Sequence, residues 1–393
     1  MTTDLWSRLV ADDSTPGYQG GTRRAIPPSE TLRRIRPLLE PAGITRLADI
    51  TGLDWIGVPV YQAIRPNSRT LSASQGKGTT RTEAKVSALM EALEGFHAEH
   101  VSLPSIRETI GSMRRHLTYD PATLDTIDRR LLTDDLILDW IPATDLTTGG
   151  PTWAPRDLCN LDLTVQPRLY APVFRVSSNG LCSGNTVGEA LIHGLCEVVE
   201  RDSCARRVRA VFEPDRSVMT DTISTPTGQR LLARFFRAGV QLQIVDMTGP
   251  TGLPCYEVWV DDPDGPTLTD GSGCHPDQSI ALVRALTEAA QSRLTYIAGA
   301  RDDILRSVYR SPLREPTRRA FTPTSASALR PFAATRSVSV GAFAAQVREV
   351  VRRVRTQTGM SPIAVDLARP NVGLPVLFVI VPGLTHRLVG RAP

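Results

Sequence analysis

The sequence predicts a mixed α/β fold, and three observations support that prediction. Short runs rich in β-branched residues alternate with helical stretches along the chain. One helical pattern occurs three times, each time after a glycine-rich segment. Apart from a Pro-, Ser- and Arg-rich surface loop expected over residues 313–337, no later stretch has the composition of a linker. We therefore expect a partly flexible N-terminal extension, residues 1–40, and one composite domain of repeated strand and helix units, residues 41–393.

The first elements follow from local chemistry. Residues 1–40 are rich in Pro, Gly and Arg, and a short helix is expected over residues 29–39, with Ser29 as its cap. β-Branched residues predict strands over residues 44–50, 58–64, 136–141, 170–176, 240–246, 254–260 and 374–381. A basic helix over residues 343–355 leads to the last of these strands.

Composition excludes several classes of protein. The 393 residues are 41% hydrophobic, which is ordinary for a chain that buries a sizeable core. The 45 basic and 41 acidic side chains leave a net charge of +4, too small and too dispersed to indicate nucleic-acid binding. No run approaches the roughly 18 apolar residues of a membrane helix, and the N-terminus lacks a secretory signal. We therefore expect a cytoplasmic protein with neither nucleic acid nor membrane as a partner.

The six cysteines form no Cys-x-x-Cys pair, so neither a zinc knuckle nor a disulfide framework is indicated. Most of them lie on apolar faces, where buried structural thiols are expected. Cys182 and Cys274, which lie near the glycine-rich segments, are the two that could carry sulfur instead.

The repeated helix covers residues 84–94, 190–200 and 281–291, which align without gaps. Each copy reads Ala, three residues, Ala or Gly, Leu, one residue, Glu, two residues, then Glu or Gln. Four residues before the first Ala lie Thr80, Thr186 and Asp277, which are suitable N-cap residues. The alignment therefore predicts three helices that present equivalent side chains.

Helix geometry places the acids of each copy on one face. At about 100° per residue, a Glu and its partner three positions later lie about 60° apart. The surrounding residues are apolar and no basic partner follows at the fourth position, so the carboxylates must be paired, protonated or bound to a metal. Oxygen ligands of this kind suit Mg²⁺ carrying a nucleotide. The candidate metal ligands are Glu91, Glu94, Glu197, Glu200 and Glu288.

Lysine is scarce, since only Lys77 and Lys85 occur among 43 arginines. Lys77 lies between two glycines just before the first repeated helix, where backbone N–H groups and the helix dipole favour phosphate. This is not the Walker pattern, because Gly78 follows Lys77. We expect Lys77 to contact a phosphate and Lys85 to carry no chemistry.

Three ordered segments resemble the signatures of the YcaO family. They are residues 74–78 (SQGKG) with the helix at 84–94, residues 178–186 (SNGLCSGNT) with the helix continuing to 202, and residues 285–294 (ALTEAAQSRL) with Arg301-Asp302. The resemblance covers the chain from about residue 40. It implies a YcaO-type α/β catalytic domain that binds ATP and Mg²⁺ and uses the γ-phosphate to activate a peptide backbone amide.

The resemblance also assigns roles to residues. Glu91, Glu197, Glu200 and Glu288 would be catalytic and, with Glu94, would form the Mg²⁺ and triphosphate side of the site. Lys77 and Arg293 would contact phosphates. The rest of the nucleotide pocket would consist of Ser74, Ser87, Asn185, Glu189 and Gln291.

The resemblance implies modification of a ribosomally made precursor peptide, with a nucleophile that decides the product. Residues 58–69 are similar to stand-alone members that work with a TfuA partner, a group associated with thioamides. The chain ends VGRAP rather than in Pro-x-Pro-x-Pro, the tail of many azoline-forming members. Thioamide formation is therefore the first expectation. An azoline-forming cyclodehydratase, an amidine-forming macrocyclase and a non-catalytic peptide-binding scaffold are the alternatives. The oligomeric state stays open, a homodimer included.

Two other features of the sequence allow a second interpretation. Glu94-x-x-His97, followed by His100, is the kind of pair that builds di-iron sites in helical bundles, but the matching positions in the second copy are Glu200 and Ser203. Ordinary hydrogen bonds are therefore expected for both histidines. The basic run at residues 201–207 is expected to form a solvated or salt-bridged face, with binding of an acidic peptide or partner as the alternative.

Overall fold

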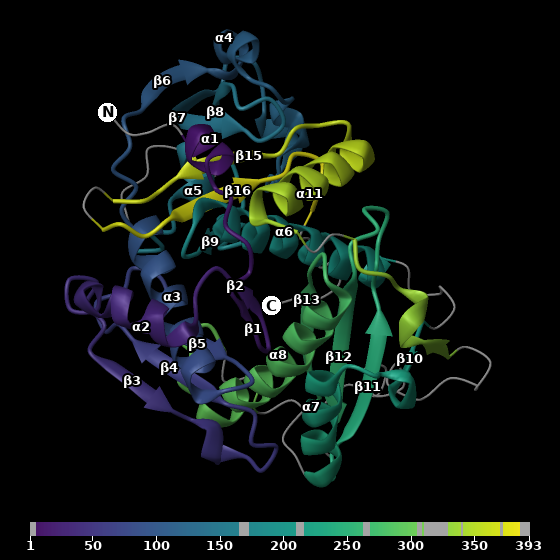
Figure 1. Ribbon diagram of the computed structural model, residues 1–393. Coiled ribbons are helices and arrows are strands. Elements are labelled where there is room, and N and C mark those ends of the chain that lie inside the picture. Colours follow the sequence, from purple (N-terminus) through teal and green to yellow (C-terminus); the bar gives the residue numbers. More distant parts are fainter. Residues whose placement is uncertain are drawn as a thin grey trace.

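The computed structural model describes residues 5–164, 173–209, 216–261, 268–304, 309, 329–338, 341–369 and 372–385. It has the mixed α/β architecture that the sequence predicts (Figure 1). Three antiparallel sheets carry the fold. The first contains β3 (Arg46–Asp49), β4 (Val60–Ile64) and β5 (Ala73–Lys77). The second contains β6 (Ile106–Thr109), β7 (Ile137–Asp145), β8 (Pro151–Pro155), β9 (Leu181–Ser183), β15 (Ile363–Asp366) and β16 (Val376–Ile380). The third contains β11 (Gln241–Asp246), β12 (Cys255–Asp261) and β13 (Thr269–Cys274).

The repeated pattern forms the helices α3 (Arg81–Ala98), α6 (Val187–Arg209) and α8 (Gln278–Ala298). The other helices are α1 (Leu5–Val10), α2 (Pro28–Ile35), α4 (Ile110–Met113), α5 (Arg156–Cys159), α7 (Pro226–Arg237) and α11 (Phe343–Thr358). Two small pairs complete the described elements: the hairpin of β1 (Tyr18–Gln19) and β2 (Arg23–Arg24), and β10 (Val218–Met219) parallel to β14 (Arg330–Pro331).

Each repeated helix follows directly on the last strand of a sheet. The strands β5, β9 and β13 each end the order of their sheet and lead into α3, α6 and α8. The segments that the sequence marks as glycine-rich turns are therefore largely strands. Their glycines hide this, because they take the place of the β-branched residues that signal strands elsewhere.

Close packing explains the glycines. A Cβ at Gly76 on β5 would lie 1.9 Å from the backbone nitrogen of Ala88 on α3. A Cβ at the equivalent Gly273 on β13 would lie 2.2 Å from the carbonyl oxygen of Ala281 on α8. Each helix thus rests on the backbone of its strand, and only glycine permits that approach.

The pair of β9 and α6 packs equally closely, but here the glycine lies on the helix instead of on the strand. The strand carries Cys182 where the other copies have glycine, and the helix carries Gly194 where they have alanine. A Cβ at Gly194 would lie 2.6 Å from the Cys182 sulfur. The "Ala or Gly" position of the repeat is therefore alanine where the facing strand residue is glycine, and glycine where the facing strand residue is Cys182.

The predicted caps are confirmed. The Thr80 side chain accepts from the Glu83 backbone N–H in a reciprocal capping box, and Asp277 accepts from the N–H groups of Ser279 and Ile280. The Thr186 hydroxyl accepts from the N–H of Glu189 at 3.2 Å. The predicted Ser29 cap is wrong, because α2 begins one residue earlier, at Pro28, a residue favoured at the first helical position.

The other predicted elements hold with exceptions. Of the strand expected over 170–176, residues 170–172 lie outside the described residues, and Phe174 forms only an isolated bridge with Thr126. Of the loop expected over 313–337, residues 313–328 lie outside the described part. Residues 330–334 form β14 and a 3₁₀ turn, in which Phe332 is buried.

The six-stranded sheet is buried on both faces at its strand β16. Along β16, residues 376, 378 and 380 pack into one hydrophobic cluster with α3, and residues 377 and 379 pack into another with α6 and α11. A third cluster joins α7 and α8 to the sheet of β11–β13. These cores hold α3, α6 and α8 in fixed positions around one centre (Figure 1).

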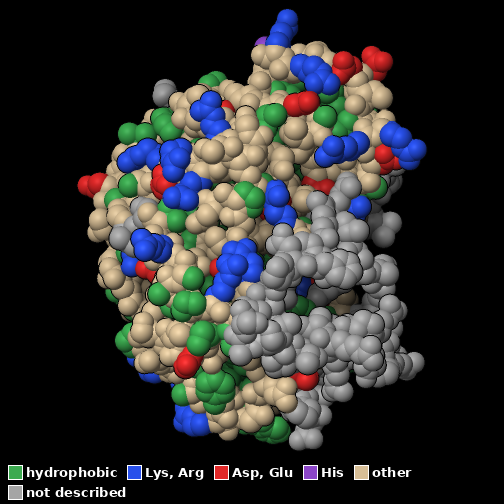
Figure 2. Space-filling model, turned by 90° about the vertical axis from the view of Figure 1, so that its right-hand side faces the viewer, with side chains coloured by type: hydrophobic (Ala, Val, Ile, Leu, Met, Phe, Trp, Pro, Cys, Tyr) green, Lys and Arg blue, Asp and Glu red, His purple; other side chains and the backbone are tan. Residues whose placement is uncertain are grey.

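Figure 2 shows Lys and Arg side chains in small groups, interspersed with Asp and Glu, over the described part of one face. Among the described residues, no helix combines the length and the apolar composition needed to cross a membrane.

Candidate active site

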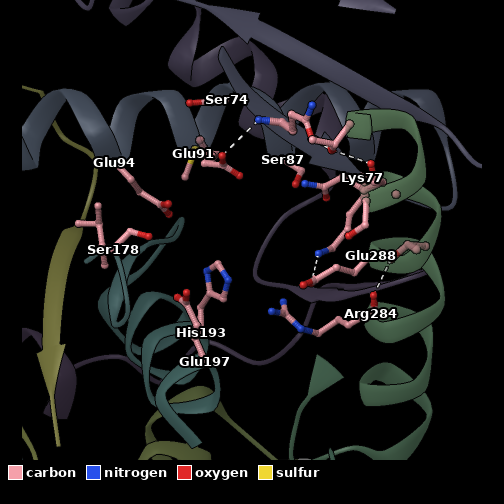
Figure 3. Close-up of a pocket in the computed structure, with 18 of the residues that line it drawn as sticks. Ser74, Lys77, Ser87, Glu91, Glu94, Ser178, His193, Glu197, Arg284 and Glu288 are labelled. Atoms are coloured by element: carbon pink, nitrogen blue, oxygen red, sulfur yellow. Dashed lines mark hydrogen bonds and ion pairs between the residues drawn. The ribbon is translucent and has the colours of Figure 1, made fainter. Parts of the chain in front are cut away.

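A cavity of about 870 Å³ lies where the three repeated helices converge (Figure 3). The predicted site residues that line it are Ser74, Lys77, Ser87, Glu91, Glu94, Asn185, Glu189, Glu197, Glu200, Glu288 and Gln291. The structure thus brings together side chains from three separate parts of the chain. Arg293 is the one predicted site residue that does not line the cavity.

The three helices present equivalent positions to this space. Glu91, Glu197 and Glu288 occupy the same place in the repeat, and all three side chains line the cavity. Four residues earlier, one helical turn away, the repeat places Ser87, His193 and Arg284, which also line it. Figure 3 shows these side chains facing one another across the cavity. His193 and Arg284 were not predicted from the sequence, although their alignment with Ser87 in the repeat could have identified them.

The carboxylates differ in how they are held. Glu91 accepts from the backbone N–H of Gln75 at 3.2 Å, and Glu94 accepts from the Ser183 hydroxyl at 2.6 Å. Glu200 is anchored to β13, because it accepts from the Ser272 hydroxyl at 3.0 Å and from the Cys274 N–H at 2.9 Å. Glu288 forms an ion pair with Lys77. No described residue donates a hydrogen bond to the carboxylate of Glu197.

Burial controls the charge of these acids. It raises the pKa of Glu94 to about 8, with help from the negative charges of Glu91 and Glu197. It also raises the pKa of Glu197 to about 7 and that of Glu91 above its ordinary value. Burial would do the same to Glu288, but Lys77 and the nearby arginines hold its pKa below the ordinary value. Without a bound cation, Glu94 therefore keeps its proton at neutral pH, whereas Glu288 is ionised.

Several cations face the acids. Besides Lys77 and Arg284, the cavity is lined by Arg24, Arg201 and Arg301. Of the basic run expected to be solvated or salt-bridged, Arg206 forms a salt bridge with Asp202. Arg201 is not solvated, because its guanidinium lies beside the buried acids of α6 and α8. Such a mixture of fixed carboxylates and guanidinium groups suits a ligand that brings both negative charge and divalent cations.

His193 is the histidine that lines the cavity among the described residues. Burial and the neighbouring positive charges, Arg284 first among them, hold its pKa well below the ordinary value. The ring is therefore neutral at pH 7 in the absence of ligand.

Arg293 lies elsewhere. Its buried guanidinium pairs with Asp54 at 3.3 Å. On a helix, a residue five positions after Glu288 is turned by about 140° from it, so its side chain leaves from another side of α8. The expected phosphate contact of Arg293 does not fit this position, and Arg284, four positions before Glu288, lies on the cavity side instead.

The N-terminal hairpin reaches the starts of all three helices. On α3, Glu83 accepts from the Gly21 N–H at 3.1 Å. On α6, Glu189 pairs with Arg24 at 3.1 Å, and at α8 the cap Asp277 pairs with Arg23 at 2.6 Å. Nothing in the local sequence signals these contacts, because each joins residues far apart in the chain.

The donors fit a nucleotide-bound metal better than an isolated ion. Among the described residues, no group of three or more His, Cys, Asp or Glu side chains is arranged to hold a metal by itself. Mg²⁺ usually takes one or two carboxylates, and phosphate and water oxygens supply its other ligands. Glu197, which faces the cavity without a donor, is suited to such partial ligation, and Glu94 would be suited once it has lost its proton.

The alternatives weighed from sequence find no support in the geometry. The Nδ1 atoms of His97 and His100 lie 2.7 and 2.6 Å from backbone carbonyl oxygens, the ordinary hydrogen bonds expected of them. Cys182 and Cys274 are fully buried. Burial raises the pKa of the Cys182 thiol, and hydrogen bonds with Cys196 and Cys255, together with burial, raise that of Cys274. They are therefore structural rather than reactive.

Comparisons with known proteins agree with this site. Residues 75–385 match the family model described as "YcaO cyclodehydratase, ATP-ad Mg2+-binding". The chain is 36% identical over 378 residues to an uncharacterised protein of Mycobacterium tuberculosis, covering 95% of this chain and 85% of that one. It is 34% identical over 401 residues to an "Uncharacterized protein in tfuA 3'region" of Rhizobium leguminosarum bv. trifolii, covering 96% and 92%.

Solved structures resemble the fold. YcaO from Methanopyrus kandleri, bound with AMPPCP and Mg²⁺, superposes with a TM-score of 0.75 at 25% identity, covering 97% of this chain and 98% of that one. A "Heterocyclase in complex with substrate and Cofactor" superposes with a TM-score of 0.79 at 22% identity, and the match covers 95% of this chain but only 54% of the heterocyclase. The chain therefore belongs to the YcaO family, an ATP- and Mg²⁺-binding family.

Proposed function

We propose that this protein is an ATP-dependent enzyme that activates a backbone amide of a ribosomally made precursor peptide, and that residues 41–393 form its catalytic domain. The observation that carries the proposal is the convergence of equivalent acids from α3, α6 and α8 with Lys77 and buried arginines on one cavity. Its volume of about 870 Å³ lies near the upper end of the range for small-molecule sites, which leaves space for a substrate segment beside a nucleotide.

Within the general reaction, we propose thioamide formation with a TfuA-like partner. Sulfide adds to the amide carbonyl, the γ-phosphoryl group passes to the carbonyl oxygen, and that oxygen leaves with inorganic phosphate, so sulfur replaces oxygen. Bound Mg-ATP would supply the phosphoryl group. The relative located in a tfuA 3′ region supports this choice.

The side chains of the cavity can serve this reaction by positioning and by balancing charge. Lys77, Arg201 and Arg284 lie where they can offset the negative charge of a triphosphate. Glu91, Glu94, Glu197 and Glu288 can hold the accompanying cations, and Glu94 would then give up the proton that burial makes it keep.

An azoline-forming cyclodehydratase is the second candidate. The family description and the superposition on a heterocyclase favour it. In that reaction a Cys, Ser or Thr side chain of the peptide is the nucleophile, and the product has lost one water. Amidine formation by an amine nucleophile would follow the same chemistry.

Nucleotide binding tests the site. Titration calorimetry with Mg-ATP should show binding by the wild-type protein, and both Glu91→Gln and Glu197→Gln should lose turnover while keeping the fold. The control is Glu40→Gln, which removes an exposed carboxylate distant in sequence from the repeats. Binding and turnover that stay unchanged in both cavity variants would refute the assignment.

Mass spectrometry of the product peptide distinguishes the reactions. Neighbouring genes should include one reading frame for a TfuA-like protein and another for a short peptide that serves as substrate. A sulfide-dependent exchange of oxygen for sulfur supports thioamidation, whereas loss of one water without a sulfide requirement supports azoline formation.

A further inference from the structure

A second, smaller hollow of about 230 Å³ lies beside the cavity, on helix α7. Three arginines dominate its lining, which consists of Thr79, Thr227, Arg230, Leu231, Ala233, Arg234 and Arg237. Thr79 also lines the large cavity, two residues after Lys77. We call this hollow the α7 groove. Thr79 is the residue that the linings of the two hollows share.

The arginines share one side of α7. Spacings of four and three residues place Arg230, Arg234 and Arg237 along one helix face. The other side of α7, with Leu232 and Phe235 among its buried residues, packs on the core. Arg230 and Arg237 are exposed, and the helix contains no Asp or Glu. Three like charges therefore stand together without an acid on the same helix.

No described carboxylate compensates them. Arg230 donates to the Thr227 hydroxyl at 2.9 Å, Arg237 donates to the carbonyl oxygen of Ala233 at 3.1 Å, and Arg234 donates to the carbonyl oxygen of Gly57. None of the three forms an ion pair with an acid in the described part of the chain.

Some exposed arginines of other helices are neutralised locally. In α2, Arg33 pairs with Glu30, and in α11, Arg352 pairs with Glu349. Like charges spaced at three and four residues destabilise a helix slightly, and a ligand that brings negative charge to the three arginines of α7 would relieve this repulsion.

An exposed aromatic residue, which is not part of the groove lining, lies two residues from the backbone that Arg234 contacts. The bond from Arg234 ties α7 to the turn that ends at Gly57, and Trp55 in that turn is 73% exposed. Tryptophan and arginine are the residues most enriched among those that dominate binding surfaces. The combination suits an extended peptide that offers carboxylates to the arginines and an apolar side chain to the tryptophan.

We propose that the α7 groove binds an acidic segment of the peptide substrate while a neighbouring amide occupies the large cavity. This rests on the proposed function, because it assumes a peptide substrate. Charge complementarity selects an acidic segment, and the shared residue Thr79 selects a chain that continues into the cavity. A hollow of about 230 Å³ accommodates a few side chains rather than a folded domain.

The test uses synthetic ten-residue peptides of alternating Glu-Ala, Gln-Ala and Lys-Ala, labelled with a fluorophore and measured by anisotropy against the full chain. The charge-reversal variant is Arg230→Glu with Arg237→Glu. The matched control is Arg348→Glu with Arg355→Glu, two exposed arginines with the same seven-residue spacing on α11. Thermal unfolding and Mg-ATP binding are measured for every variant, so failure of the nucleotide site is seen separately from failure of the groove.

We expect the wild-type protein and the control to bind the Glu-Ala peptide and not the Gln-Ala peptide, with affinity that falls as salt rises. The groove variant should weaken this binding by roughly tenfold or more at low salt, since two attractions become repulsions. It should also gain affinity for the Lys-Ala peptide, which mere structural damage would not produce.

Three results would overturn the proposal. One is equal binding of the Glu-Ala peptide by the wild-type protein and the groove variant. Another is complete displacement of that peptide by inorganic phosphate at equal concentration, which would indicate a simple anion site. The third is a dimer that only the groove variant disrupts, without peptide binding by the wild type, which would assign the surface to a second copy of the chain.

Discussion

Replacing Glu94 by glutamine should make the ligand-free protein more stable at alkaline pH. Glu94 is a buried residue of the cavity wall, and its pKa is raised from 4.5 to about 8. In the unfolded chain the carboxyl loses its proton near pH 4.5, whereas in the folded chain it keeps the proton until about pH 8. Between these values the folded state binds more protons than the unfolded state, so stability falls as pH rises.

The size of this effect follows from the two pKa values. Each pH unit in which only the folded state is protonated costs about 1.36 kcal/mol of unfolding free energy. From pH 5.5 to pH 8.5, Glu94 alone should therefore reduce stability by on the order of 3 kcal/mol. Glu94→Gln removes this dependence but keeps an oxygen that can accept the hydrogen bond from the Ser183 hydroxyl.

Urea unfolding in the presence of a chelator, at pH 5.5, 7.0 and 8.5, measures the prediction. The wild-type midpoint should fall across the series, and the Glu94→Gln midpoint should fall much less, at similar m-values. Glu40→Gln, at an exposed site, should follow the wild type. If wild type and Glu94→Gln lose stability in parallel, the carboxyl is not held protonated by burial and the electrostatic description of the cavity is wrong.

Three further changes test other parts of the structure. Lys77→Met removes the cation that holds the pKa of Glu288 low, so Mg-ATP affinity measured by calorimetry should fall roughly 10- to 100-fold at pH 6 and less at pH 8. Gly194→Ala should cost about 1–3 kcal/mol of unfolding free energy because its Cβ meets the Cys182 sulfur. Adding Cys182→Gly should recover part of that loss. If the double variant instead loses the sum of the two single-variant changes in unfolding free energy, measured with urea, residues 182 and 194 do not compensate each other. Arg293→Met leaves a buried carboxylate unpaired and should cost about 3–5 kcal/mol. A loss of nucleotide affinity without loss of stability would instead return Arg293 to the phosphate site.

The parts of the site that could be predicted from sequence are those that repeat locally. Capping and the spacing of acids depend on neighbours within one or two helical turns, so the alignment of the three copies predicted Thr80 and Asp277 as caps and placed Glu91, Glu197 and Glu288 in equivalent positions. The convergence of those acids on one cavity also followed, because carboxylates in apolar helices need a common partner.

The parts that could not be predicted depend on contacts between distant segments. Arg24 reaches Glu189 across 165 positions, and no local pattern marks that pairing. Arg293 was misplaced because its role came from a resemblance rather than from its angle on α8. The strand β5 was not predicted, because close packing against α3 requires glycine where strands usually have β-branched residues.

The cavity is completed by contacts between residues far apart in the sequence, and this affects when the protein can fold during synthesis. Arg23 and Asp277, which join the hairpin to α8, are separated by 254 positions, and Lys77 and Glu288 by 211. A ribosome must therefore release most of the chain before the pocket exists, and folding that waits on such distant contacts is slow. Nucleotide can stabilise only molecules that have finished folding. A cell rich in ATP would thus protect the mature protein from unfolding but give no help to one still being synthesised.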